Sequence, residues 1–119
     1  MTPIPASALL VTQSDERLLA LARSGHERAF EAIIKRYRTP LRRYIRRLLP
    51  EEAAEDALQQ ASINAWTSLS GGARINDLRP WLYRVAHNAS IDVLRAGKYD
   101  IAELSESLSA LGSTEEDVE

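Results

Sequence analysis

The sequence predicts an all-α fold, a compact bundle of three long helices preceded by one short helix. The composition favours helices, because Ala, Leu, Arg and Glu are abundant and runs of β-branched residues are few. Apolar residues recur at helical spacing over residues 30–48, and capping residues and prolines separate this stretch from its neighbours. With 119 residues, 45% of them apolar, the chain is long enough to bury one hydrophobic core.

The first helix is expected near residues 15–24. Ser14 places a capping hydroxyl before it, and Asp15 and Glu16 place two carboxylates at the positive end of its dipole. The pair Ser24–Gly25 is typical of a helix end.

The second helix has the clearest pattern in the chain. Pro40 interrupts it and Thr39 is placed to cap a restart, so we expect a kink or a short break there, and Pro50 ends the helix. Its apolar stripe consists of Phe30, Ile33, Ile34, Tyr37, Leu41, Tyr44, Ile45 and Leu48.

Two further helices are expected over residues 51–69 and from residue 77 to about residue 98, with a Gly-rich turn between them. Pro80 is tolerated in the first turn of the last helix. The expected inward residues of the third helix are Ala54, Leu58, Ala61, Ala65 and Leu69. Those of the fourth are Trp81, Leu82, Val85, Ala89 and Val93.

Charge is distributed unevenly along the chain. The formal net charge is −2, but residues 17–50 carry +8, residues 51–70 carry −4 and residues 71–98 carry +3, while residues 99–119 carry −7. This pattern indicates different partners for different surfaces, although solvated helix faces would also produce it.

The helix pattern and the charge distribution together divide the chain into three segments. We expect a flexible N-terminus over residues 1–13, a helical domain over residues 14–99 and an acidic linker or tail over residues 100–119.

Composition disfavours several classes of function. The chain has no cysteine, which excludes a disulfide framework, a thiolate metal site and a cysteine nucleophile. His26 and His87 lie far apart in the sequence without neighbouring ligands, and the glycines after Ser70 lack the Lys of a phosphate-binding loop. We therefore predict no catalytic residue, no metal and no cofactor.

Membrane insertion and export are disfavoured as well. No apolar run approaches the roughly 18 residues of a membrane span, and residues 1–12 lack the basic start of a signal peptide. We expect a cytoplasmic protein without a membrane partner.

One side of the fourth helix carries a basic stripe. Its members share a face at helical spacing: Arg84, His87, Asn88, Ile91, Arg95 and Lys98. The loop before this helix adds Arg74, Asn76 and Arg79. Arg and Lys bind phosphates, and Asn and Arg contact base edges, so the stripe and the loop favour single-stranded nucleic acid. A solvated helix face is the alternative.

The third helix has the opposite character, since residues 51–70 contain no basic residue. Its polar side would repel DNA and is a candidate for protein docking, although plain solvation explains it equally well. This polar side consists of Asp56, Gln59, Gln60, Ser62 and Asn64.

Four stretches, in order and with short gaps, carry a resemblance to a known family. They cover residues 15–30, 37–49, 54–66 and 79–95, and include AEDALQ, RPWLYRVAHN and IDVLR. Together they resemble the conserved-region-2 domain of bacterial extracytoplasmic-function (group 4) sigma factors over roughly residues 14–98. That domain is an all-helical module.

The resemblance implies a promoter-specificity subunit of RNA polymerase without catalysis of its own. In the family, the helix matching residues 54–66 docks on the coiled coil of the β′ clamp. The loop and helix matching residues 70–98 recognise the promoter −10 element and trap a base flipped from the non-template strand. The resemblance implies DNA binding by Ile75, Asn76, Asp77, Arg84, Asn88 and Arg95. The basic stripe and its loop add Arg74, Arg79, His87 and Lys98 to the predicted DNA-binding residues. The implied core-polymerase-binding residues are Asp56, Gln59, Gln60 and Asn64.

Two positions depart from the family pattern, because Gln60 replaces the usual acid and Ser62 the usual aromatic residue. Loss of the acid removes one contact to a basic clamp helix, worth about 1 kcal/mol. The chain also ends within what resembles the linker to a −35-binding domain. We therefore expect either a piece of a longer sigma factor, which we favour, or a natural single-domain relative.

Two alternatives stay open. The first is a sigma-like protein-interaction module whose partner is an anti-sigma factor and which does not recognise DNA itself. The second, a structural or enzymatic helical protein, is disfavoured by the missing ligand clusters. Salt-dependent binding of single-stranded DNA separates the sigma domain from the interaction module.

Overall fold

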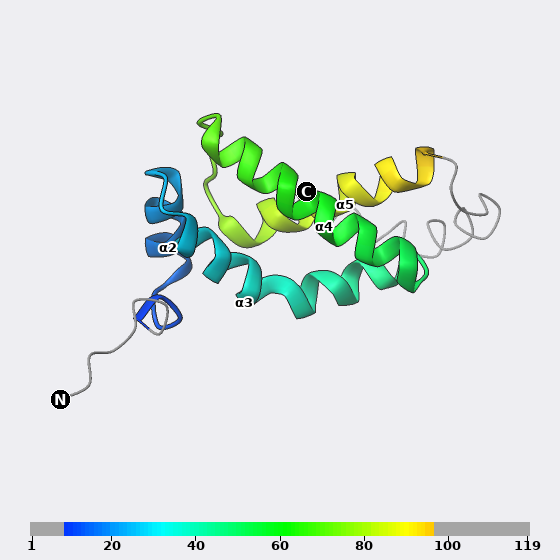
Figure 1. The fold of residues 1–119 in the computed structure, drawn as a ribbon, viewed down its shortest axis with the longest axis horizontal. Helices are drawn as coiled ribbons and strands as arrows, with labels where there is room; N and C mark the ends of the chain where they lie inside the picture. The colour runs from blue at the N-terminus through cyan, green and yellow to red at the C-terminus, as the bar shows by residue number, and fades with distance from the viewer. Residues whose placement is uncertain (1–8, 97–119) are drawn as a thin grey trace.

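The computed structural model describes residues 9–96 and confirms the all-α bundle. Its four labelled helices are α2 (Asp15–Arg23), α3 (Glu27–Arg46), α4 (Glu51–Ser70) and α5 (Leu78–Arg95). Figure 1 shows α2 at one end, α3 along one side, and α4 crossing over α5. The short leading helix and the three long helices agree with the sequence prediction.

The ends of α2 form as the sequence indicates. The Ser14 hydroxyl accepts a hydrogen bond from the backbone N–H of Arg17 at 3.1 Å, which satisfies one of the free donors of the first turn. After the helix, Gly25 adopts a φ of 97°, a left-handed conformation that glycine adopts without a Cβ clash. His26 then caps α3, since its Nδ1 accepts from the backbone N–H of Ala29 at 3.2 Å.

Helix α3 is continuous through Pro40, so the short break that the sequence allowed at this residue is absent. Figure 1 shows that α3 changes direction along its length, the bend that an internal proline produces when it removes one helical hydrogen bond. The helix persists because its apolar stripe is buried on both sides of Pro40: Ile33 is 0% and Ile45 is 0% exposed.

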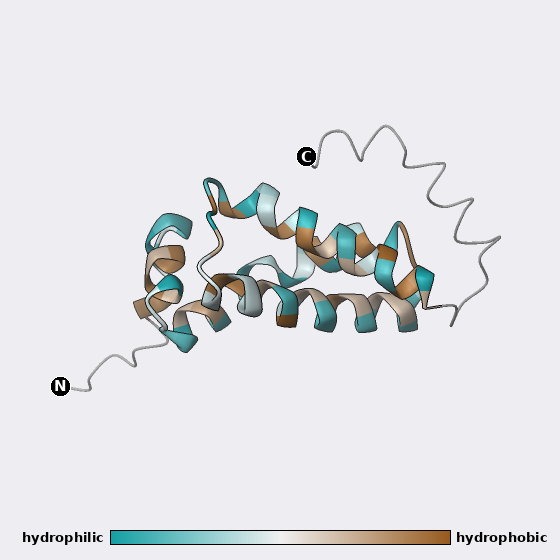
Figure 2. Cartoon of the chain, turned by 90° about the horizontal axis from the view of Figure 1, so that it is seen from above, coloured by the Kyte–Doolittle hydropathy of each residue, from teal (hydrophilic) through white to brown (hydrophobic). Residues whose placement is uncertain are grey.

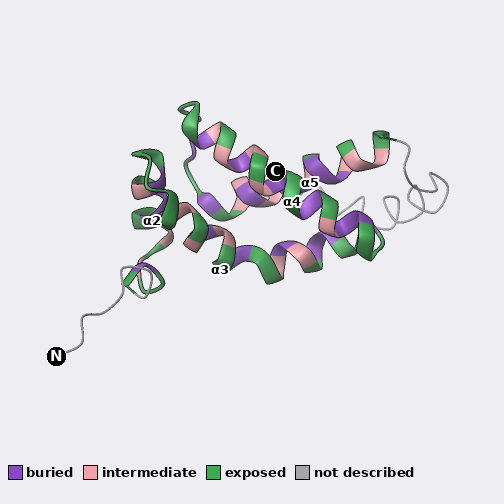
Figure 3. Cartoon of the chain, in the orientation of Figure 1, coloured by how far each residue is buried: buried purple, intermediate pink, exposed green. Residues whose placement is uncertain are grey.

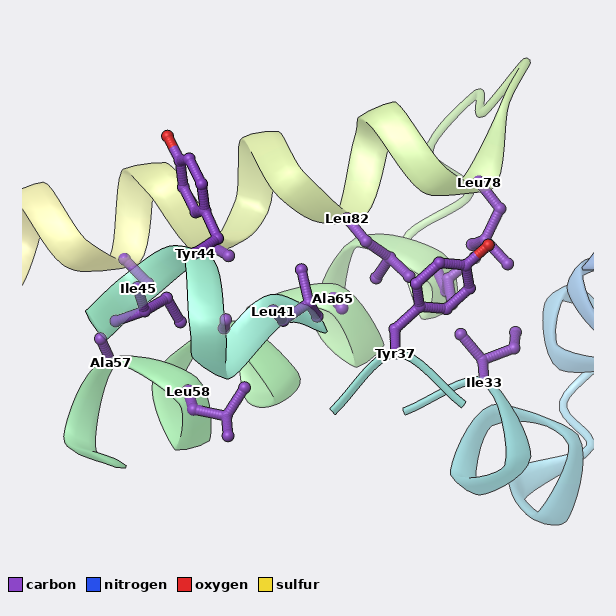
Figure 4. Close-up of a cluster of buried hydrophobic side chains, with 14 of the residues drawn as sticks. Ile33, Tyr37, Leu41, Tyr44, Ile45, Ala57, Leu58, Ala65, Leu78 and Leu82 are labelled. Atoms are coloured by element: carbon purple, nitrogen blue, oxygen red, sulfur yellow. The ribbon is translucent and has the colours of Figure 1, made fainter. Parts of the chain in front are cut away.

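The core lies where α3, α4 and α5 meet. In Figure 2 hydrophilic and hydrophobic residues alternate along the long helices, and Figure 3 shows buried residues on their inward sides. Figure 4 shows the central cluster, in which aromatic and aliphatic side chains of α3 lie with alanines and Leu58 of α4 and with Leu78 and Leu82 at the start of α5. All five predicted inward residues of α4 are buried: Ala54, Leu58, Ala61, Ala65 and Leu69.

The buried side of α5 differs in part from the prediction. Leu82 and Ala89 are buried as expected, but Trp81, Val85 and Val93 are only half-buried. The centre of the buried side is formed instead by Leu78, Ala86 and Ser90. The hydroxyl of Ser90 donates to the carbonyl of Ala86 at 2.8 Å, which explains how a polar residue is buried there.

The described part of the N-terminal segment, residues 9–13, contacts the bundle. Leu10 is 8% exposed and belongs to the core cluster. Arg36 on α3 donates to the carbonyls of Val11 and Gln13 at 3.1 and 2.7 Å, and to the Asp15 carboxylate at 2.8 Å. The Arg36 guanidinium therefore joins this segment and the start of α2 to α3, and the Tyr37 hydroxyl also donates to Asp15. Residues 1–8, Lys98 and the acidic tail lie outside the described residues.

Candidate functional site

The outer side of α5 presents three of the predicted DNA-binding side chains. Arg84, Asn88 and Arg95 are exposed. They are spaced four and seven residues apart on the side opposite Leu82, Ala86 and Ala89, so burial of the apolar side directs them outward together. This arrangement provides two guanidinium groups and one amide along a single line.

His87 belongs to a seam between α3 and α5 rather than to the open side of α5. Its Nδ1 lies 2.8 Å from the Tyr44 hydroxyl, and the ring of Tyr44 packs edge-on against the ring of Tyr83 at 5.5 Å. The guanidinium of Arg79 stacks 5.8 Å from the Tyr83 ring centre. These contacts fix the orientation of α5 beside α3 and leave His87 half-buried.

The DNA-binding residues predicted in the loop between α4 and α5 and in the first turn of α5 fall into two groups, one exposed and one buried. Arg74, Asn76 and Asp77 are exposed, and so is Arg79 in the first turn of α5. Ile75 is 6% exposed and packs in the core, so its side chain anchors the loop and is not on the surface with its neighbours. The polar residues beside it are thereby held at one end of α5.

The predicted docking residues gather on one side of α4. Asp56, Gln59 and Gln60 are exposed, and Asn64 is half-buried. Gln60 Nε2 donates to Asn64 Oδ1 at 2.9 Å, which orients both amides. A groove runs between this side of α4 and the edge of α5. Its lining is Asp56, Gln59, Gln60, Ile63 and Asn64 from α4, Asp92 and Val93 from α5, and Ala96.

An apolar patch beside this groove was missed by sequence reasoning. Ile63 is 52% exposed, the rings of Phe30 and Trp66 pack at 5.1 Å, and the three residues line a shallow hollow whose rim carries Glu27 and Glu31. Ile63 lies off the inward stripe of its helix, and an apolar residue off that stripe was the available signal. Exposed apolar area beside oriented amides is typical of protein interfaces.

No group of three or more His, Asp or Glu side chains within residues 9–96 is arranged to hold a metal ion. No helix in this range is both long enough and apolar enough to cross a membrane.

Comparison with known proteins places this arrangement in a family. The family model described as Sigma-70 region 2 matches residues 33–98, which span most of α3 and the whole of α4 and α5. The chain belongs to the sigma-70 region 2 family, and its curated relatives identify it as the extracytoplasmic-function type of this domain.

Three relatives illustrate the similarity. The chain is 31% identical over 83 residues to the RNA polymerase sigma factor CnrH of Cupriavidus metallidurans, covering 69% of this chain and 44% of the relative. It is 28% identical over 83 residues to the ECF RNA polymerase sigma-E factor of Escherichia coli, with 70% and 44% covered. It is 33% identical over 87 residues to the ECF RNA polymerase sigma factor SigM of Mycobacterium tuberculosis, with 72% and 44% covered.

The chain thus matches less than half of the length of these curated relatives. No solved structure matches it.

Proposed function

We propose that this domain acts in transcription initiation, with one face for core RNA polymerase and another for the promoter −10 element. The observation that carries the proposal is the separation of charge between two neighbouring helices. Helix α4 presents carboxylate and amide groups without a single cation, while the outer side of α5 presents guanidinium groups. One domain can therefore hold a basic protein surface and a DNA strand at the same time.

The polymerase face is assigned to Asp56, Gln59, Gln60 and Asn64. The partner proposed for them is the β′ clamp coiled coil. An exposed carboxylate accepts hydrogen bonds from Arg and Lys, and the Gln60–Asn64 pair supplies amides in a set orientation. The neighbouring Ile63 adds apolar area that such a contact would cover.

The DNA face is assigned to the outer side of α5 and the loop before it. Its exposed residues are Arg74, Asn76, Asp77, Arg79, Arg84, Asn88 and Arg95. A short exposed loop held next to a basic helix suits a single strand whose bases turn away from their stack. His87 and Ile75 support this face from beneath, through Tyr44 and through the core. Lys98, outside the described residues, extends the stripe in sequence.

A protein-interaction module with an anti-sigma factor as its partner is the second candidate. The apolar hollow at Phe30, Ile63 and Trp66 favours it, because a protein partner would cover that hollow while DNA would not. This candidate predicts protein binding without salt-dependent DNA binding.

The deciding experiment is binding of the chain to a purified β′ clamp coiled-coil fragment, measured by isothermal titration calorimetry. The Asp56→Ala, Gln59→Ala double variant is expected to bind at least about tenfold more weakly, because a charge-assisted hydrogen bond is worth about 1.5–3 kcal/mol. Glu16→Ala is the control, since it removes one exposed carboxylate from α2. Circular dichroism checks that each variant is folded.

Equal loss in the control variant would mean that overall charge, rather than the α4 face, governs the contact. Absence of binding by the unaltered chain would contradict the polymerase role and favour the anti-sigma partner.

A further inference from the structure

Arg36, near the middle of α3, pairs with Asp15, but among the four arginines at residues 42–47 only Arg42 forms an ion pair within residues 9–96. Arg42 faces α4, where its guanidinium pairs with Glu51 at 3.1 Å and with Glu55 at 2.9 Å. These two carboxylates belong to the acidic start of α4. The ion pairs of Arg42 therefore join α3 to α4 and neutralise its charge.

Arg43 and the C-cap residue Arg47 lie on another side of α3. Arg47 follows Tyr44 by three residues and Arg43 precedes Arg47 by four, which places the two guanidinium groups on adjacent turns of one edge. Both side chains are exposed, and neither forms an ion pair within residues 9–96. Tyr44 marks this edge as the one beside α5, because its hydroxyl contacts His87.

The part of α5 next to this edge contributes no opposing charge. The rings of Tyr83 and His87 contact Tyr44 there, and Asp92 lines the groove between α5 and α4. The edge of α3 and the outer side of α5 therefore form one surface on which Arg43, Arg47, Arg84 and Arg95 are all exposed.

We infer that Arg43 and Arg47 form a second phosphate-binding site, which continues the path of the DNA strand from α5 across the Tyr44–His87 seam onto α3. The inference rests on the proposed DNA role of α5. The two arginines are one turn apart, about 6 Å along the helix axis, a separation that lets each contact a different phosphate of an extended strand. These contacts would add affinity without reading sequence.

The competing explanation is that the two arginines only face solvent and interact with the C-terminal end of the α3 dipole. Cations near a helix C-terminus are favourable there, and this role needs no ligand. It predicts an effect on stability alone, whereas phosphate binding predicts a change in the salt dependence of DNA affinity.

The test measures fluorescence anisotropy of a labelled random-sequence single-stranded DNA pool at about 50 to about 200 mM NaCl. The Arg43→Gln, Arg47→Gln variant is expected to bind roughly tenfold more weakly at the lower salt. The plot of log affinity against log salt concentration should become shallower by about 1.4, since each phosphate contact to a single strand contributes about 0.7.

The matched control is Arg28→Gln, Lys35→Gln, which removes the same two charges from exposed positions about half a turn away from Tyr44 on α3. This control is expected to keep the salt slope of the unaltered chain. Thermal melts followed by circular dichroism verify that both variants fold.

Equal losses in the two double variants would overturn the inference, because charge alone would then explain them. An unchanged affinity in the Arg43, Arg47 variant would overturn it too. If Arg84→Ala, Arg95→Ala still abolishes binding in that case, the proposed DNA face on α5 stands without its extension. A chain that binds no DNA at all contradicts both proposals.

Discussion

The hydroxyl of Tyr44 lies 2.8 Å from Nδ1 of His87 and joins α3 to α5 across 43 positions of sequence. Tyr44 is 7% exposed, and its hydroxyl contacts the half-buried His87 at the border of the proposed DNA face. The same ring packs edge-on against Tyr83. This arrangement links the packing of the bundle to the orientation of the basic side chains on α5.

Tyr44→Phe is expected to lower the free energy of unfolding by about 1 kcal/mol, because it removes one hydrogen-bond partner of His87 while the aromatic packing stays. Thermal unfolding should show a melting temperature lower by about 4–8 °C for a domain of this size. Tyr83→Phe, which keeps its ring contacts and removes a hydroxyl without a partner among the described residues, serves as the control. Equal effects of the two changes would contradict the role assigned to the Tyr44–His87 contact.

Tyr37 is expected to titrate above the ordinary tyrosine value. Burial, and then the hydrogen bond and negative charge of Asp15, raise the pKa of Tyr37 from 10.0 to about 12. The folded state therefore holds this proton more tightly than the unfolded state does. The corresponding stability is fully present below pH 10 and is lost as the pH rises through about 12.

An alkaline titration of tyrosinate absorbance, on the folded protein, measures this shift. Asp15→Asn is expected to bring the pKa of Tyr37 down toward its ordinary value, because it removes the carboxylate charge. Tyr37→Phe identifies the step by deleting it. A late step that persists in Tyr37→Phe would assign the shift to another tyrosine.

Ala86→Leu is expected to destabilise the fold by about 1–3 kcal/mol. Ala86 is 0% exposed, and it is one of many alanines between α4 and α5 that let the two backbones approach closely. Ala20→Leu on the exposed side of α2 adds the same volume where nothing is crowded. Urea unfolding compares the free energies of unfolding of the two variants. An Ala86→Leu variant as stable as Ala20→Leu would show that the α4–α5 interface accommodates the larger side chain.

Gln60→Glu is expected to strengthen binding to the β′ clamp fragment by about 1 kcal/mol, if that fragment presents a basic helix to α4. The change adds a carboxylate to the face that already carries Asp56. Asn64 retains a partner, because its amide N–H donates to the new carboxylate. Weaker binding after this change would indicate that the docking partner is not basic at this position.

Arg84→Ala, Arg95→Ala is expected to reduce promoter opening by a holoenzyme assembled with this chain. Both side chains are exposed on α5, so the fold is expected to persist. Permanganate footprinting of unpaired thymines measures the opening, with Arg23→Ala on α2 as the control. Undiminished opening would contradict the assignment of Arg84 and Arg95 to the DNA face.

Local sequence patterns were sufficient to predict the helices and to predict which of the candidate site residues on α4 and α5 are exposed. The cap at Ser14, the apolar stripe of α3 and the alanines of α4 all act through neighbours within a few residues, and the structure confirms them. The exposure of Asp56 and Arg84 follows from the same periodicity, because a helix with one buried side must expose the other.

Other features depended on contacts between distant parts of the chain. Ile75 is buried because the bundle offers its loop an apolar site, and Pro40 stays inside α3 because packing on both sides outweighs the lost hydrogen bond. Residues 9–13 are held by Arg36, more than twenty positions later in the sequence.

The division of the arginines on α3 arises in the same way. Periodicity places Arg42 and Arg43 on different sides of the helix, but only the position of α4 decides that Arg42 is neutralised. A charge has a partner only when the fold brings one within a few ångströms, and no local spacing contains that information. The sequence therefore determined where the charges lie on each helix, while the tertiary structure decided which of them remain available to a ligand.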